Sequence, residues 1–211
     1  MVMVNDDIIV AYSKIAERYA NTFFHELDNK PLDRKLYELF ASRVPENGKC
    51  IEVGCGPGEI SAFLNGIGVN ITGIDKSMEM IEQAKRCNRK IKFIQEDVFK
   101  LSFESNCIDG LVAPYLIVNF SDNEIKRSFQ EMNRVMKSNS PLLIVFHVGK
   151  NKKLKIMNFF EKSNKIVFIL HKPEKIKKML KDALFSIEEV IIKEPYENEI
   201  TKRGFIFAKK L

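Results

Sequence analysis

Short apolar runs alternate along the chain with longer stretches in which apolar residues recur at helical spacing. The apolar runs are strand-sized and cover residues 49–53, 70–74, 92–95, 110–113 and 142–148. The stretches with helical spacing cover residues 60–68, Met78–Cys87, Asn123–Met136 and Lys175–Leu184. Strands that alternate with single helices usually form one parallel sheet with helices on both faces. The pattern therefore predicts an α/β fold with a doubly wound sheet.

Both ends of the chain depart from this alternation. Residues 6–44 carry apolar positions at helical spacing only, and Pro31 suits the first turn of a second helix, so two helices are expected there. Residues 188–195 and 203–210 are strand-like runs joined by a loop too short for a parallel crossover. We expect this pair to be antiparallel at one edge of the sheet. No repeat or linker divides the chain, so one domain over residues 1–211 is predicted.

The composition is ordinary for a soluble globular protein, with 45% hydrophobic and 29% charged residues. No apolar run approaches the roughly 20 residues that span a bilayer, so no membrane partner is expected. Asp6 and Asp7 stand where a signal peptide would be positively charged, which favours a cytoplasmic location. The four cysteines form no CxxC pair and lie near no histidine at ligand spacing, so no metal site is predicted.

A glycine-rich segment, IEVGCGPG at residues 51–58, joins the first predicted strand to the following helix. Gly54 and Gly56 allow a tight turn and a close approach of a ligand to the backbone, beside the free amides of a helix N-terminus. Asp75 ends the second predicted strand, where an acidic side chain can accept hydrogen bonds from ribose hydroxyls. Together these features predict a cofactor that contains adenosine.

The charges around the glycine loop indicate which cofactor it is. Glu52 precedes the first glycine, and Glu59 stands where a dinucleotide fingerprint would have its third glycine. Acidic groups on both sides would repel a pyrophosphate but suit a ligand with an ammonium and a sulfonium. S-adenosylmethionine is such a ligand, and it is favoured over a nicotinamide cofactor.

At this point the chain resembles the class I S-adenosylmethionine-dependent methyltransferases over nearly its whole length. The E-x-G-x-G-x-G loop is formed by Glu52, Gly54, Gly56 and Gly58, and the D-x-S-x-x-M-x-x-x-A pattern by Asp75, Ser77, Met80 and Ala84. An acidic strand end appears in FIQEDVF at residues 93–99. The F-x-E-x-x-R-V-x-K motif is formed by Phe129, Glu131, Arg134, Val135 and Lys137. Both ends of the chain are similar to a bacterial branch whose substrates are mostly unassigned. The resemblance implies a Rossmann-like, seven-stranded, mostly parallel sheet with an antiparallel last strand.

The resemblance also implies roles for individual residues. Glu52 would receive the cofactor's ammonium above Gly54, Cys55 and Gly56. Asp75 would bind the ribose hydroxyls, with Lys76 beside it, and Met80 would cover the adenine. The remaining predicted cofactor contacts are Asp97 and the Val98 amide at the adenine amino group, Ala113 and Pro114 beside the sulfonium, and Tyr19 as a cover.

Candidate catalytic residues follow the fourth and fifth strands, at the sheet edge where open α/β folds bind ligands. Methyl transfer needs an acceptor held in line with the sulfonium, and a hydroxyl or ammonium acceptor must also lose a proton. His147 is the candidate base because its side chain titrates near neutral pH, and Tyr115 is the second candidate. Sequences of the family that this chain resembles commonly have a histidine near the position of Asn119, so the chain departs from the family pattern there.

An insertion at residues 149–171, together with the cap helices of residues 1–45, is expected to roof the acceptor site. Residues 149–181 hold eleven lysines and two glutamates, so they carry more than the whole net charge of +6. This positive surplus could attract a nucleic acid, but no recognised nucleic-acid-binding motif accompanies it. The favoured interpretation is that these lysines are solvated residues on exposed helix faces. The prediction is methyl transfer to a small molecule. The alternatives are transfer to RNA or protein, and a protein that binds S-adenosylmethionine without catalysis.

Overall fold

A computed structural model describes residues 5–150, 152–157, 159–160, 165–197 and 199–211. Its main feature is a seven-stranded sheet with the strand order β3-β2-β1-β4-β5-β9-β8. The strands are β1 (Lys49–Val53), β2 (Asn70–Asp75), β3 (Lys92–Gln95), β4 (Gly110–Pro114), β5 (Pro141–His147), β8 (Phe185–Lys193) and β9 (Arg203–Lys210). Neighbours are parallel from β3 to β5, whereas β9 is antiparallel to both β5 and β8. The predicted mostly parallel α/β sheet and its antiparallel terminal pair are confirmed.

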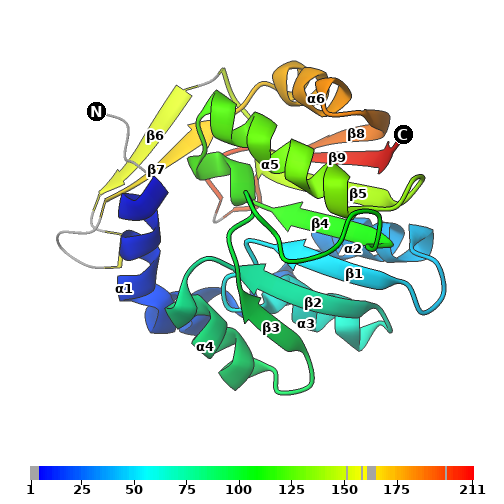
Figure 1. The fold of residues 1–211 in the computed structure, drawn as a ribbon. Coiled ribbons are helices and arrows are strands. Elements are labelled where there is room, and N and C mark those ends of the chain that lie inside the picture. Colours follow the sequence, from blue (N-terminus) through cyan, green and yellow to red (C-terminus); the bar gives the residue numbers. More distant parts are fainter. Residues whose placement is uncertain (1–4, 151, 158, 161–164, 198) are drawn as a thin grey trace.

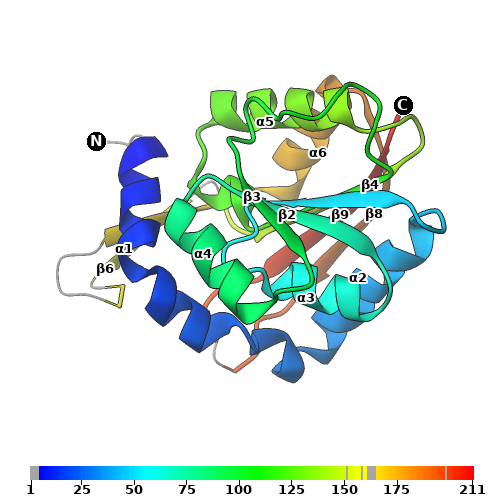
Figure 2. The same ribbon diagram turned by 60° about the horizontal axis from the view of Figure 1, so that its bottom comes forward.

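Helices cover both faces of this sheet (Figures 1 and 2). On one face lie α5 (Asp122–Val135) and α6 (Pro173–Asp182); on the other lie α2 (Pro31–Arg43), α3 (Glu59–Gly66) and α4 (Met78–Cys87). The strands support both layers because successive side chains point to opposite faces. In β5, Leu142 and Ile144 pack with α5, whereas Leu143 and Val145 pack with α2 and α3.

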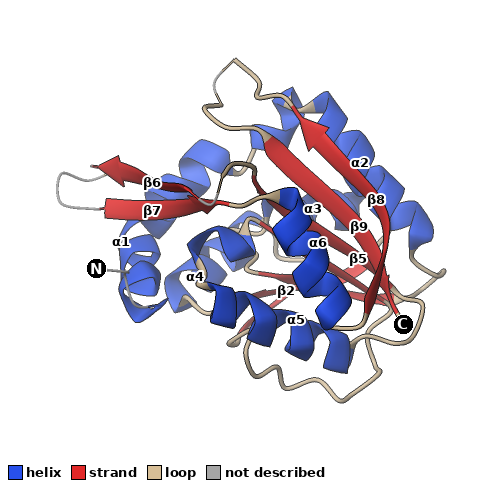
Figure 3. Cartoon of the chain, turned by 90° about the horizontal axis from the view of Figure 1, so that it is seen from above, coloured by secondary structure: helices blue, strands red, loops and turns tan. Residues whose placement is uncertain are grey.

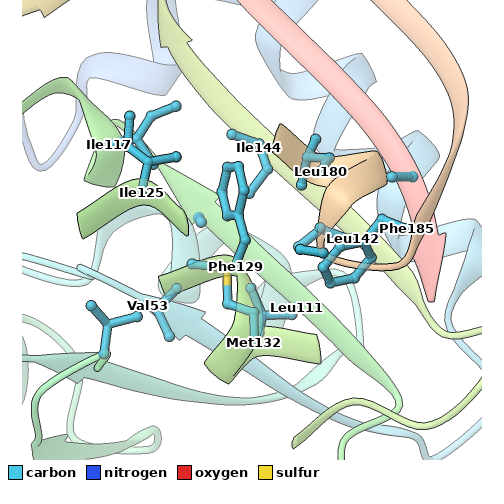
Figure 4. Packing of buried hydrophobic residues seen from close by; sticks show 14 of the residues in the cluster. Val53, Leu111, Ile117, Ile125, Phe129, Met132, Leu142, Ile144, Leu180 and Phe185 are labelled. Carbon is cyan, nitrogen blue, oxygen red and sulfur yellow. The ribbon is translucent and has the colours of Figure 1, made fainter. Parts of the chain in front are cut away.

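The core between the sheet and α5 is filled by apolar side chains that are fully buried (Figure 4). Phe129 and Met132 of α5 have no exposed surface and pack with Leu111 and Ile144 of the sheet. Burial of each such side chain stabilises the fold by about 1.5–3 kcal/mol. This core holds the strand ends rigidly, and those ends carry the residues of the site described below.

The insertion predicted at residues 149–171 contains a two-stranded antiparallel ribbon that the hydrophobic pattern did not predict. It consists of β6 (Lys152–Met157) and β7 (Lys165–Leu170), and residues 151, 158 and 161–164 of the insertion lie outside the described residues. The ribbon lies beside α1 (Asn5–Phe23), as Figure 3 shows. An Arg18 Nη1 to Phe160 carbonyl hydrogen bond of 2.7 Å connects the two.

The ribbon is also anchored to the main sheet. The His171 amide donates to the His147 carbonyl at 2.8 Å, and the Gly149 amide donates back to the His171 carbonyl at 3.0 Å. These bonds hold the ribbon at the carboxyl end of β5. Within the described part of the chain, none of the helices has the length and apolar content to cross a bilayer.

Candidate active site

A cavity lies at the carboxyl ends of β1, β2 and β4, between these strand ends and α1. Its wall combines the glycine loop, the acidic ends of β2 and β3, the segment after β4, and one face of α1. The sequence-predicted residues that line it are Tyr19, Glu52, Gly54, Cys55, Gly56, Asp75, Lys76, Met80, Asp97, Val98, Pro114 and Tyr115. The fold therefore brings almost all of the predicted cofactor set together around one space.

The glycine loop takes a conformation that side chains disfavour. Gly54 and Gly58 have φ angles of 73° and 80°, in the left-handed region. A Cβ atom on Gly58 would lie 2.7 Å from the Phe93 ring, and one on Gly54 would lie 2.8 Å from a Leu116 methyl carbon. The loop thus passes closely between β1 and α3 with its backbone facing the cavity, as ligand binding to main-chain atoms requires.

Asp75 connects the glycine loop to the start of α4. One carboxylate oxygen accepts the Gly56 amide at 2.9 Å, and the other accepts the Ser77 amide at 2.9 Å. Burial raises the pKa of Asp75, and these hydrogen bonds oppose the rise. Each carboxylate oxygen can still accept a second hydrogen bond, so the side chain remains able to receive hydroxyl donors from the cavity.

Two glutamates, the buried Glu52 and the half-buried Glu59, lie at opposite ends of the glycine loop. Burial raises the pKa of Glu52 to about 8, although the Ser61 hydroxyl donates to its carboxylate at 2.5 Å. Burial also raises the pKa of Glu59 to about 8, and this carboxylate accepts the Leu27 amide at 2.7 Å. A cation in the cavity would favour the ionised form of both groups, which is the charge preference predicted from the sequence.

The ends of β2 and β3 are joined across the cavity wall. Lys76 Nζ lies 3.2 Å from Asp97 Oδ2, and the other Asp97 oxygen accepts the Phe99 amide at 2.9 Å. Met80 and Val98 are buried on either side of this pair and present apolar surface to the cavity. The arrangement suits a flat polar ring that is covered by apolar side chains and hydrogen-bonded at its edge.

Ala113 and His147 do not line the cavity. Ala113 is fully buried in the hydrophobic core. The His147 ring packs between Tyr115 and Phe168, with centroid distances of 5.3 Å and 5.1 Å, and its Nδ1 is 2.8 Å from the Thr201 hydroxyl. Burial, together with nearby Arg203, lowers the pKa of His147 to about 3. The ring thus packs against Tyr115 outside the cavity wall, and a base at His147 stays a prediction.

Comparison with known proteins is consistent with this geometry. A family model described as a methyltransferase domain matches residues 50–139, which run from β1 to the turn after α5. This segment of the chain is therefore similar to methyltransferase domains. Sequence similarity extends to YqeM of Bacillus subtilis, 29% identical over 138 residues, which are 63% of this chain and 56% of YqeM. The chain therefore matches little more than half the length of that relative.

Two further similarities were found, one in sequence and one in fold. Demethylmenaquinone methyltransferase of Thermotoga maritima is 28% identical over 165 residues, which are 72% of this chain and 68% of that protein. The fold matches that of DhpI, solved as a complex with SAH, with a TM-score of 0.75 at 17% identity; 97% of this chain and 96% of DhpI are covered. At that identity the structural match shows the fold.

Sequence reasoning missed much of the wall that α1 contributes to the cavity. Tyr12 and Phe23 line the cavity beside Tyr19, with Tyr12–Tyr19 and Tyr19–Phe23 centroid distances of 5.8 Å and 4.7 Å. Ile8, Tyr12, Tyr19 and Phe23 are separated by multiples of about one helical turn, so they share one face of α1. That spacing was the available signal, and it was interpreted only as a helix.

Proposed function

We propose that this chain transfers a methyl group from S-adenosylmethionine to a small-molecule acceptor. The observation that supports this most directly is the cavity wall, in which an acidic glycine loop and Asp75 stand on one side and the segment after β4 on the other. Glu52 and the loop backbone would hold the cofactor's methionine end, and Asp75 its ribose hydroxyls. Met80, Asp97 and Val98 would hold the adenine.

The bound cofactor supplies a methyl group on a positively charged sulfur, which is already activated for displacement. The protein's contribution is to hold the acceptor in line and to exclude water. Pro114 and Tyr115 line the cavity after β4 and would face the acceptor side. Tyr115 has a φ of 54°, so its backbone is held in a conformation that is rare for a bulky residue. This fixed position suits a side chain that shapes an acceptor site.

A small acceptor is favoured because α1 lines the cavity and is itself packed against the insertion. Tyr19 packs against Phe159 and Phe160 of the insertion, each at a ring-centroid distance of 6.4 Å. A cover made of packed aromatic rings leaves little access for a folded macromolecule. The demethylmenaquinone methyltransferase named above is, by its name, a protein that acts on a small molecule, which agrees with this choice.

Titration calorimetry with S-adenosylhomocysteine tests the cofactor assignment. Asp75→Ala should weaken binding by about 5- to 150-fold, equivalent to about 1–3 kcal/mol for a lost hydrogen-bonding carboxylate. Glu82→Ala, on the exposed side of α4, is the matched control and should bind as the wild type does. Unchanged affinity in Asp75→Ala would contradict the ribose role.

Methyl-labelled cofactor and fractionated cell extract test the transfer itself. Label in the small-molecule fraction is the expected result. Label in RNase-sensitive material or in protein would replace the proposed acceptor class. Cofactor binding with no transfer to any fraction would identify a protein that binds the cofactor without catalysis.

A further inference from the structure

One part of the cavity is lined by α1, by Glu59 and by the segment after β4. We call this part the acceptor chamber, and the side chains that define it are Tyr12, Tyr19, Phe23, Glu59, Tyr115 and Asn119. These side chains also interact electrostatically. Burial raises the pKa of Tyr19, and the nearby Tyr12, Glu59 and Tyr115 groups raise it further. Four of the six side chains are aromatic.

Within the described part of the chain, the acceptor chamber contains one buried hydrogen-bond acceptor without a donor, on the Asn119 side chain, which also interacts with Tyr12. Asn119 Oδ1 is buried and has no hydrogen-bond partner among the described residues. The Glu59 carboxylate accepts one backbone amide, from Leu27, and faces the cavity. A buried acceptor without a donor is costly unless a ligand supplies one. The unpartnered Asn119 oxygen therefore indicates a ligand that donates a hydrogen bond.

The charge in the cavity points the same way. Of the described residues that line it, Lys76 alone is basic, and it lies beside Asp97 at the predicted adenine end. Glu26 also lines the cavity, but Lys30 lies 2.5 Å from its carboxylate. Glu59 has no such cation within salt-bridge distance in the described part of the chain. An anionic acceptor would meet repulsion at Glu59, whereas a cationic one would supply the missing positive charge.

We propose that the methyl acceptor is an amine whose nitrogen donates hydrogen bonds to Glu59 and Asn119 and whose apolar body contacts the aromatic rings of α1. The proposal rests on the methyltransferase function proposed above and names its substrate class. The faces of Tyr12, Tyr19 and Phe23 suit such a ligand, because aromatic rings attract ammonium groups and cover apolar carbon.

The chemistry of an amine acceptor balances with these residues. The nitrogen lone pair forms the new bond to the methyl carbon as the bond from that carbon to sulfur breaks, and the electron pair of the broken bond stays on sulfur. Because an ammonium has no lone pair, the Glu59 carboxylate first accepts one proton from the bound ammonium. The methylated product leaves as an ammonium, and Glu59 then returns its proton to solvent. A carboxyl group whose pKa is raised to about 8 by burial is matched to proton exchange with an amine near neutral pH. The groups around Glu59 are Glu26, Lys30, Glu52 and the Leu27 amide.

Matched acceptors test the substrate class. Adenosylhomocysteine formation is measured with phenethylamine, 4-ethylphenol and 3-phenylpropanoate, which carry similar apolar bodies on different polar groups. We expect the amine to be methylated with a kcat/KM at least about 10-fold above the others. Preferential methylation of the phenol or the carboxylate would overturn the proposal.

The labelled product from cell extract decides the question if none of the three probes is methylated. A product that is retained on a cation exchanger at acid pH and keeps its label in alkali is an N-methylated amine and supports the proposal. An anionic or neutral product, or label released as methanol, overturns it while leaving the proposed function intact. Failure to bind S-adenosylhomocysteine would instead refute the proposed function.

Variants test the two named residues. Glu59→Gln keeps an oxygen for the Leu27 amide, so the fold is retained, and it should lower kcat/KM for the amine by about 100-fold or more. Its affinity for S-adenosylhomocysteine should change by less than about 3-fold. Asn119→Leu should lower kcat/KM by about 5- to 150-fold. The exposed control Glu82→Gln should match the wild type, and full activity of Glu59→Gln would overturn the role of Glu59.

Discussion

A buried charge network next to the acceptor chamber offers a sharp test of the structure. Glu199 has a side chain that is only 4% exposed, and it lies 2.7 Å from Lys30 Nζ, 3.0 Å from Lys193 Nζ and 3.4 Å from an Arg203 nitrogen. It also accepts the Tyr196 amide at 3.1 Å. Replacing Glu199 with glutamine removes the negative charge that the three cations share, while Asp33 stays 3.3 Å from Lys193 and Glu26 stays 2.5 Å from Lys30.

The cost of this change follows from the pKa of Glu199. Burial alone would raise it, but the ion pairs with Lys30 and Lys193 outweigh burial and lower it from 4.5 to about 2. A shift of that size stabilises the folded state by about 3 kcal/mol at neutral pH. Because the pKa is lower in the folded protein, this stabilisation is present above pH 5 and is lost as the pH falls towards 2. About half of it should remain near pH 3.

Urea unfolding of the wild type and Glu199→Gln from pH 3 to pH 7 measures this difference directly. The gap in the free energy of unfolding should be about 3 kcal/mol at pH 7 and should narrow as the pH falls. Glu194→Gln is the control, because Glu194 pairs with Lys202 but its side chain is 73% exposed, and it should change stability by less than about 1 kcal/mol. A gap below 1 kcal/mol for Glu199→Gln at pH 7, or a gap that does not change with pH, would refute the reasoning.

Three further predictions concern the cofactor loop and the strand ends. Burial raises the pKa of Glu52 to about 8, so binding of the S-adenosylhomocysteine ammonium at pH 7 should ionise Glu52 and release a proton. The affinity for S-adenosylhomocysteine should therefore rise from pH 6 to pH 8. Calorimetry in buffers of different ionisation enthalpy measures the proton release, and its absence would contradict the prediction. Gly58→Ala should destabilise the fold by at least about 1 kcal/mol more than Gly68→Ala, since both have positive φ but only the first meets Phe93; equal urea midpoints would contradict this. His147→Gln should change kcat by less than about 10-fold without altering the pH profile, and a loss of about 100-fold or more would support a base at His147.

The parts of the fold that the sequence predicted are those specified by local pattern. In β1, β2 and β4 a short apolar run is followed by a helical stretch, so the order and type of these elements could be predicted without tertiary information. The glycine loop was predictable because its backbone conformation restricts which residues can occupy it. Asp75 was predictable because it ends a strand next to that loop, and strand ends converge at one edge of a parallel sheet.

The parts that the sequence did not predict depend on tertiary contacts. The ribbon of β6 and β7 is stabilised by packing, as Ile166 of β7 is buried against Ala11 and Ile15 of α1. A two-stranded ribbon is marginal without such a partner, so its own residues give little signal. His147 ends a strand, where a catalytic residue could stand, but the direction of its ring is set by Phe168 and Thr201, which are distant in sequence.

The antiparallel direction of β9 has a practical consequence. Its first residue, Arg203, lies at the same sheet edge as His147, and the Arg203 guanidinium is 5.5 Å from the Tyr115 ring centre. The strand then runs away from that edge, so Leu211 emerges at the opposite end of the molecule from α1 (Figure 1). An affinity tag or a surface attachment at the carboxyl terminus would leave the cavity mouth free, whereas a fusion ahead of α1 would start next to its cover. Binding experiments on this protein are therefore best designed with the carboxyl-terminal end as the handle.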